Sequence, residues 1–292
     1  MQILEKILKT QDLATLPVVA SKILHLLENE NINIQMIARL VESDPALSIK
    51  VLRIANSPIF ASRVEVTSLS QAIMNLGINR LSNIILSVSI FSKFMMNKNQ
   101  NLAKYVDKFW WHSSSVGVVS KIFAQKTQQN FKEKEFLAGL LHDIGKLILM
   151  QYDPISYEQV LKRQEEEPNL SDIDVEKEIF GINHFDVGLA IAQKWKLPSE
   201  MIEVIRYHNF PSKSLKQQKL VATVRMADLL CEIWGAGFYE GIHTLDMEEE
   251  ESWKVLKTLD KNLATADLAK ITFEVENEFL KSSEFLAILK SN

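Results

Sequence analysis

Apolar residues recur at three- and four-residue spacing along most of the chain, which is the period of a helix that buries one face. Only nine Gly and seven Pro interrupt this pattern in 292 residues. No segment is convincing as a strand, so the sequence predicts an all-α, multi-helix bundle. The predicted helices cover residues 2–9, 17–30, 33–42, 45–56, two segments within 68–94, 105–127, 137–150, 184–196, 199–209, 220–234, 252–259 and 264–288.

Short polar signals mark the ends of several predicted helices. Asp44 stands directly before Pro45, which makes it a candidate N-cap for the helix that the proline opens. Ser68 or Ser70 is expected to cap the next helix. Gly77 follows that helix and is expected to adopt positive φ there, because glycine is the usual residue at this position.

The polar stretch 95–104 predicts a boundary between two helical lobes. The N-terminal lobe is expected over about 10–95 and the second lobe over about 105–232. Residues 233–292 are expected to form a C-terminal helical segment. A chain of this length suits one large domain or two smaller ones.

The two helices within residues 68–94 have the outline of a DNA-binding helix-turn-helix. Phosphate contacts dominate nucleic-acid affinity and need Lys and Arg. The second helix offers only Arg80 before Lys93 and is otherwise mostly apolar. We therefore favour a packed helical hairpin and expect no nucleic-acid binding, with a DNA-binding regulator as a minor alternative.

Composition and charge are those of a soluble globular protein, with 47% hydrophobic residues, 24% charged residues and a net charge of −4. No run of eighteen apolar residues predicts a membrane span. The N-terminus lacks the pattern of a signal peptide. Cys231 is the single cysteine, so no internal disulfide can form, and we expect a cytoplasmic location.

The predicted helix Leu137–Met150 carries polar residues inside its apolar stripe. His142, Asp143 and Lys146 fall within one turn, and such groups are costly to bury unless they are paired, hydrogen-bonded or bound to a metal. Gly145 weakens a helix by up to about 1 kcal/mol relative to Ala, which indicates a close backbone approach there. The alternative is an ordinary core histidine beside an Asp143–Lys146 ion pair.

Helical spacing places six histidine and aspartate side chains on the inward faces of the predicted helices. Each alone is more typical of a hydrogen-bonded core residue, but facing helices of a bundle also build metal sites from such side chains. These donors suit Fe, Mn, Zn, Co or Ni, or an adjacent pair of divalent ions that activates water for attack on a phosphoester. Lys146 would then hold a phosphate oxygen. The six residues are His112, His142, Asp143, His184, His208 and Asp228.

The order of four of these residues resembles the HD superfamily of metal-dependent phosphohydrolases. A histidine comes first, a His-Asp pair follows in an LLHDIGK context, and an aspartate follows in an AD context. The residues that match this core motif are His112, His142, Asp143 and Asp228.

The HD-GYP branch of that superfamily is matched only in part. His184, in an H-x-x-x-G pattern, and His208 match its extra histidines. Asn209 stands where that branch has a second His, the Gly-Tyr-Pro motif is absent, and Lys108 replaces a Glu one turn before His112. These departures speak against cyclic-di-GMP phosphodiesterase activity.

The stretches LPVVASKILHLL, ESDPALSIKVLRIANS and SLSQAIMNLGINRLSNIIL resemble the HDOD family, the HD-related output domain. The resemblance runs from about Asp12 to Trp234. It implies a bacterial signal-transduction or regulatory protein that acts on a signalling protein partner, with a metal, nucleotide or phosphoester in its HD-like pocket. The alternative is an active metal-dependent phosphohydrolase, in which Asp143 and Lys146 would be catalytic. We favour the regulator without turnover.

Overall fold

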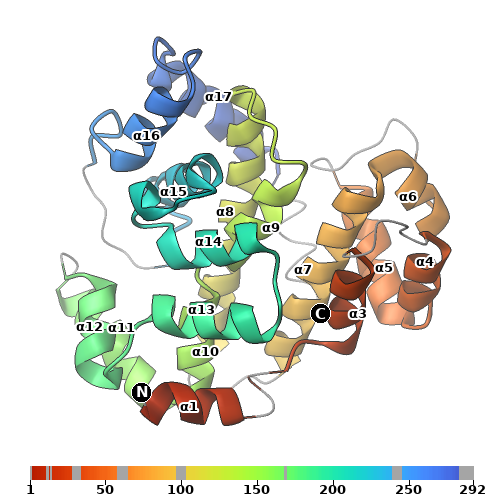
Figure 1. The fold of residues 1–292 in the computed structure, drawn as a ribbon, viewed down its shortest axis with the longest axis horizontal. Coiled ribbons are helices and arrows are strands. Elements are labelled where there is room, and N and C mark those ends of the chain that lie inside the picture. Colours follow the sequence, from red (N-terminus) through yellow and green to blue (C-terminus); the bar gives the residue numbers. More distant parts are fainter. Residues whose placement is uncertain are drawn as a thin grey trace.

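The computed structural model describes residues 2–10, 13, 15–27, 34–57, 65–96, 103–167, 170–238 and 245–282. Regular structure within these ranges is entirely helical, which confirms the predicted all-α fold (Figure 1). In the part of the chain so described, no helix is both long and apolar enough to cross a membrane. The elements are α1 (Gln2–Lys9), α3 (Val18–Leu27), α4 (Ile34–Glu42), α5 (Pro45–Ala55), α6 (Leu69–Leu76), α7 (Ile78–Met96), α8 (Ala103–Lys126), α9 (Lys134–Leu141), α10 (Ile144–Tyr152), α11 (Pro154–Glu166), α12 (Asp172–Phe180), α13 (His184–Lys194), α14 (Ser199–Tyr207), the 3₁₀ turn η2 (Pro211–Lys213), α15 (Gln218–Ile233), α16 (Glu251–Leu259) and α17 (Leu268–Leu280).

The predicted cap residues take the expected positions. The Asp44 side chain accepts a hydrogen bond from the Leu47 amide and starts α5. Ser68, rather than Ser70, caps α6 through the Gln71 amide. Gly77 ends α6 with a φ of +78°, which an L side chain adopts only with strain, so the chain turns there into α7.

Helices α3 to α7 form one body, at the right of Figure 1, and α8 to α17 form the other. Helix α7 packs on α3 and α5 within the first body and reaches α9 in the second. Arg80 and Asn83 of α7 both bind Glu133, which lies just before α9. The boundary at 95–104 stays a prediction, since 97–102 lie outside the described residues.

Helix α8 is the central element of the second body. It packs against α9, α15 and α17, and nearly every residue from Phe109 to Ala124 is buried. A helix that is covered on all sides must sit in the core of a domain. His112 on this helix therefore faces protein rather than solvent, as its spacing predicts.

The prediction of one continuous helix over Leu137–Met150 is wrong. Helix α9 ends at Leu141, and α10 begins at Ile144 after a turn formed by His142 and Asp143. The Lys146 amide bonds the Asp143 carbonyl at 2.9 Å, three residues back instead of four. Both short helices are buried, so their apolar pattern continues across the turn and conceals it.

Residues 153–183, for which the sequence analysis predicted no helix, contain α11 and α12. Asp153 caps α11 by accepting a hydrogen bond from the Ser156 amide. Helix α12 buries Val175, Glu176 and Phe180 within the second body. Its exposed residues are charged, and for this reason the segment looks like a solvated connector in sequence.

Other predicted ends are shorter in the structure or fall outside it. The helix predicted over 264–288 is observed as α17, and residues 283–292 lie outside the described residues. The helix predicted over 17–30 is observed as α3, and residues 28–30 also lie outside them.

Candidate metal centre

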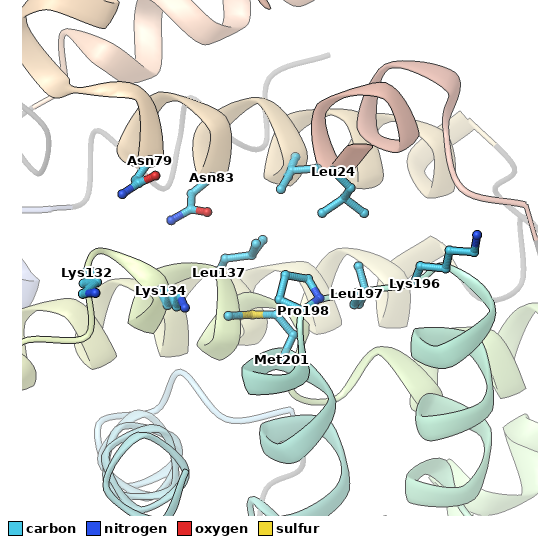
Figure 2. Close-up of a pocket in the computed structure, with 11 residues that line it drawn as sticks. Leu24, Asn79, Asn83, Lys132, Lys134, Leu137, Lys196, Leu197, Pro198 and Met201 are labelled. Atoms are coloured by element: carbon cyan, nitrogen blue, oxygen red, sulfur yellow. The ribbon is translucent and has the colours of Figure 1, made fainter. Parts of the chain in front are cut away.

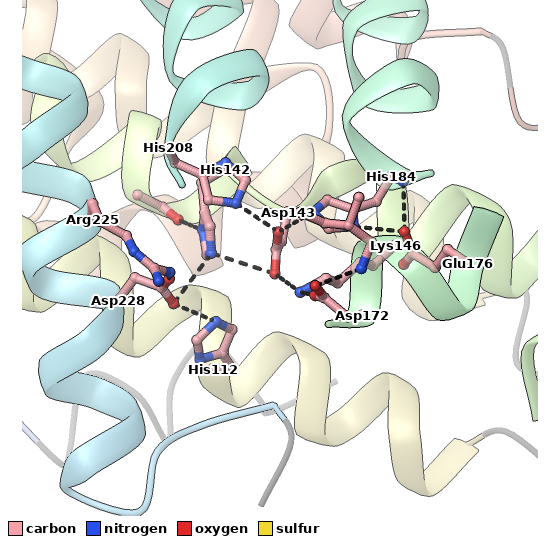
Figure 3. Close-up of polar contacts among 12 residues, drawn as sticks. His112, His142, Asp143, Lys146, Asp172, Glu176, His184, His208, Arg225 and Asp228 are labelled. Atoms are coloured by element: carbon pink, nitrogen blue, oxygen red, sulfur yellow. Dashed lines mark hydrogen bonds and ion pairs between the residues drawn. The ribbon is translucent and has the colours of Figure 1, made fainter. Parts of the chain in front are cut away.

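The six predicted inward residues lie together in the second body (Figure 3). They come from α8, from the turn between α9 and α10, from the start of α13, from the end of α14 and from α15. Each is only 1–4% exposed, so the whole group is removed from solvent. They are His112, His142, Asp143, His184, His208 and Asp228.

Every histidine in the group is held through Nδ1. In three of them the partner is a main-chain carbonyl oxygen: Ala236 at 3.0 Å from His112, Gly139 at 2.7 Å from His142 and Val204 at 3.2 Å from His208. A carbonyl can only accept, so Nδ1 carries the proton and Nε2 is left with a lone pair when the ring is neutral. Metal-binding histidines are commonly oriented in this way.

His184 is held by a side chain instead. One carboxylate oxygen of Glu176 lies 2.7 Å from Nδ1 of His184 and 2.7 Å from its main-chain nitrogen. Both ends of the residue are therefore fixed by a single carboxylate on α12. This arrangement turns Nε2 of His184 toward the other histidines.

The Nε2 atoms converge on two carboxylates. Their distances to carboxylate oxygens are 3.2 Å for His112 to Asp228, 3.6 Å for His142 to Asp228, 3.5 Å for His142 to Asp143, 3.6 Å for His184 to Asp143 and 3.2 Å for His208 to Asp143. The donors form two groups, each with ligand atoms within 4.8 Å of one another, and Asp143 belongs to both. The groups are His112, His142 and Asp143, and Asp143, His184 and His208.

Three atoms of the centre are buried without a hydrogen-bond partner. They are Nε2 of His142, Nε2 of His184 and Oδ1 of Asp143. Leaving a buried polar atom unsatisfied costs free energy, and native structures contain few such atoms. A divalent cation among them would satisfy all three, and imidazole with carboxylate is a donor set that Fe, Mn, Zn, Co and Ni accept. A hydrogen-bonded polar core accounts for the Nδ1 contacts but not for these three atoms.

Both carboxylates are held in the ionised form. Burial alone would raise the pKa of Asp143, but Lys146 and His142 outweigh it and hold that pKa well below its usual range. Burial is likewise outweighed at Asp228, where the adjacent His112 and His142 rings and the Arg225 guanidinium keep the pKa well below its ordinary value. The centre thus offers anionic oxygens to a cation at neutral pH.

The histidines differ in how readily they hold a proton. Burial lowers the pKa of His208 to about 4, so this ring is neutral at physiological pH. Burial also acts on His142 and His184, but Asp143 raises the pKa of the first and Glu176 raises that of the second. A metal ion at these two rings would compete with a proton, so its affinity would fall in acid.

Lys146 lies between two carboxylates. Its Nζ is 2.7 Å from Asp143 and 2.8 Å from Asp172 of α12, and it is 6% exposed. Burial would lower the pKa of Lys146, but Asp143 and Asp172 raise it well above the usual value, so it is a permanent cation. Its expected contact with a phosphate oxygen stays a prediction.

Three residues of this site were missed in sequence. Glu176 and Asp172 lie one turn apart on α12, and Arg225 lies one turn before Asp228 and donates to it at 2.7 Å. The one available signal for the burial of Glu176 was its position directly after the apolar Val175 in a polar segment. Nothing in the sequence marked Arg225 as part of the site, since a single arginine on a helix usually lies at the protein surface.

A helical bundle with a buried His/Asp centre at an LLHDIGK turn is the architecture of HD-type domains. The family model of the HDOD domain matches residues 13–211, and the chain belongs to the HDOD family.

Two solved structures share the fold of this chain over nearly their whole length. An HDOD domain protein of unknown function from Geobacter sulfurreducens has a TM-score of 0.76 at 26% identity, covering 95% of this chain and 92% of that one. A candidate phosphohydrolase from Shewanella amazonensis SB2B has a TM-score of 0.73 at 22% identity, covering 98% and 97%. An uncharacterized protein of Treponema pallidum (strain Nichols) is 25% identical over 225 residues, or 76% of this chain. The chain spans 42% of the length of that curated relative.

Proposed function

We propose that this protein is a metal-binding regulatory member of the HDOD family that signals through contacts with another protein. One observation supports this function above the others. The donor group is complete and oriented for a cation, yet every one of its side chains is nearly inaccessible to solvent. Because a substrate cannot reach a site that solvent does not reach, such a site is better suited to stabilising one conformation of the fold than to turning over a substrate.

The ligands in this proposal are the six predicted residues. His112, His142 and Asp228 would hold an ion on one side of Asp143. His184 and His208 would hold one on its other side. When bound, a divalent ion supplies positive charge that joins α8, α13, α14 and α15 to the α9–α10 turn. Its binding free energy would add to the free energy of unfolding, because an unfolded chain offers no such site.

The position of Lys146 also favours a regulator over an enzyme. In a phosphohydrolase a lysine beside the metal would be expected to reach phosphate. Here the ammonium already bridges Asp143 and Asp172. A phosphate would have to share this ammonium with two carboxylates that already neutralise its charge.

Metal content is the direct test. The protein would be purified without chelator or nickel resin, beside Asp143→Ala, and both analysed by elemental mass spectrometry and thermal unfolding. We expect near-stoichiometric Fe, Mn or Zn in the natural protein, none in the variant, and a fall in melting temperature on chelation. We also expect binding to a signalling partner to change on chelation. Metal-free protein with a melting temperature insensitive to added metals would contradict the proposal.

Phosphohydrolase activity is the second candidate function. The observation that favours it is the sharing of Asp143 between two donor groups, which is how two adjacent metals are clamped in enzymes that hydrolyse phosphoesters. The name of the Shewanella amazonensis relative gives the same class of reaction. A panel of nucleotides and phosphoesters, assayed after chelation and again with Mn²⁺ or Fe²⁺, tests it. Metal-restored turnover that Asp143→Ala abolishes would establish the enzyme and remove the first proposal.

A further inference from the structure

A cavity separate from the metal centre lies where the two bodies of the protein face each other (Figure 2). It is bounded by α3 and α7 on one side, and on the other by the start of α9 and the connection from α13 to α14. Its volume is about 450 Å³, in the range of pockets that hold a small molecule. We call it the interlobe cavity, and it shares no lining residue with the metal centre.

The wall of the interlobe cavity is apolar and its edges are polar. The apolar part is supplied by Leu24, Leu86, Leu137, Leu197, Pro198 and Met201. Two amides, Asn79 and Asn83, stand on α7 at one end, as Figure 2 shows. A mainly apolar wall with a few placed polar groups is typical of a ligand site.

Three lysines line the cavity, with Lys132 and Lys134 at one end and Lys196 at the opposite end (Figure 2). Lys134 forms an ion pair with Glu200, but Lys132 and Lys196 make no ion pair with any residue that the structure describes. The other acid nearby, Glu133, is already bound by Arg80 and by Lys121. The cavity therefore has an excess of positive charge.

The two unpaired lysines occupy backbone conformations that favour glycine. Lys132 has a φ of +55° and Lys196 a φ of +54°. Lys196 directly follows α13, where Leu197 bonds back to Ala192 in the manner of a helix end that usually holds Gly. A side chain in this region costs about 1 kcal/mol or more, and strain of this kind gathers at functional sites.

Three helices also begin at the cavity. The first turns of α7, α9 and α14 contribute Asn79, Lys134 and the preceding Pro198 to its lining. The N-terminal end of a helix carries unpaired amide groups and a partial positive charge, which favours an anion. The lysines and the N-terminal ends of these helices therefore both favour binding of an anion.

We infer that the interlobe cavity binds a small organic phosphate of about the size of a nucleotide. The phosphate would lie at the end of the cavity marked by Lys132, beside Asn79 and the first turns of α7 and α9, and the organic part would lie along the apolar wall toward Lys196. Such a ligand would touch both bodies of the protein. It would also contact α9 and α14 at the ends opposite His142 and His208, about 12 Å away for an eight-residue helix.

The test uses the whole chain after chelation, so that phosphate cannot bind through a metal ion. The probes are AMP and inorganic pyrophosphate, with adenosine as the uncharged counterpart, titrated by calorimetry. Lys132→Gln/Lys196→Gln removes two exposed cations from the cavity edge. Lys261→Gln/Lys270→Gln removes two exposed cations near α17 and is the matched control. Lys146→Gln, used at a temperature where circular dichroism shows that it is folded, reports on any binding at the metal centre.

We expect AMP to bind more tightly than adenosine and pyrophosphate, and more weakly as salt is raised. The cavity variant should lose about tenfold or more in affinity, the factor given by one charge-assisted hydrogen bond. The control variant should stay within about twofold. Absence of AMP binding, equal binding of pyrophosphate, equal loss in the control, or loss confined to Lys146→Gln would each overturn the inference. None of these outcomes depends on metal content, so the proposed function is tested separately.

Discussion

Gly145 and His184 meet main chain to main chain, at the crossing of α10 and α13. A β-carbon at residue 145 would overlap the His184 carbonyl oxygen and lie 2.9 Å from the Gly188 amide nitrogen. The backbone approach expected at Gly145 is thereby confirmed. We expect Gly145→Ala to force α10 and α13 apart and to lower the free energy of unfolding by about 3 kcal/mol, as overpacking does in cores. Urea denaturation of the chelated protein measures this.

Gly77→Ala is the comparison for that variant. A β-carbon at Gly77 meets no atom within 4 Å, but its φ of +78° imposes strain. This variant should cost about 2 kcal/mol, the penalty of placing a side chain in a positive-φ extended conformation (ψ of 162°) that is essentially restricted to glycine. A Gly145→Ala protein as stable as Gly77→Ala would show that α10 and α13 can separate freely.

Glu176→Gln tests the orientation of His184. The carboxylate contacts Nδ1 and the main-chain nitrogen of that residue, and outer partners of this kind are worth about 10–100-fold in metal affinity. We expect a loss of that size in a competition assay with a chromogenic chelator. Glu178→Gln, on the same helix but paired at the surface with Arg163, should bind metal normally. Equal affinities in the two variants would remove Glu176 from the site.

Lys146→Met tests the cation between Asp143 and Asp172. Removing one partner of a buried ion pair leaves the other charge uncompensated, which costs about 3–5 kcal/mol. We expect a loss of this order in chelated protein, measured by denaturant unfolding. Lys162→Met removes an exposed lysine 3.9 Å from Glu158 and should change stability by less than about 1 kcal/mol. Similar losses in both would show that the buried pairing contributes nothing.

Stability in acid should report on Glu133, which joins the two bodies. Burial raises its pKa, but Arg80 and Lys121 outweigh burial and lower the pKa below the ordinary 4.5. A carboxylate with a lowered folded-state pKa stabilises the fold above its unfolded value, and this contribution disappears as pH falls through the folded value. The stability difference between natural protein and Glu133→Gln should therefore be largest near neutral pH and shrink below about 4.5. A difference independent of pH would contradict this assignment.

The positions of the helices were largely predictable because the residues that begin and end each helix lie within a few positions of its ends in sequence. Asp44, Ser68 and Gly77 act on the backbone within a few residues, so their roles do not depend on distant packing. The break at His142 and Asp143 was hidden for the opposite reason. It is imposed by neighbours on α13 and α15, and the apolar pattern is the same with or without it.

The candidate centre was predictable as a set of residues but not as a complete site. Inward histidines stand out, because an imidazole on an apolar face is unusual. Glu176 and Asp172 lie in a polar segment, where acidic residues are normally solvated. Only the side-chain contacts of Asp172 with Lys146 and of Glu176 with His184 show that these two acids belong to the centre. The role of the six residues as metal ligands stays a prediction.

The Nδ1 contacts also bear on how the centre withstands mutation over time. Ala236, Gly139 and Val204 hold their histidines through carbonyl oxygens, which every amino acid possesses. A side-chain change at Ala236 or Val204 leaves the acceptor in place, whereas a β-carbon at Gly139 would lie 2.8 Å from the Val116 carbonyl oxygen, so that position is restricted to glycine. Glu176 is different, since its hold on His184 is lost with a single codon change. One substitution on the α12 side can thus alter the part of the centre that His184 occupies and leave the carbonyl-held histidines unchanged.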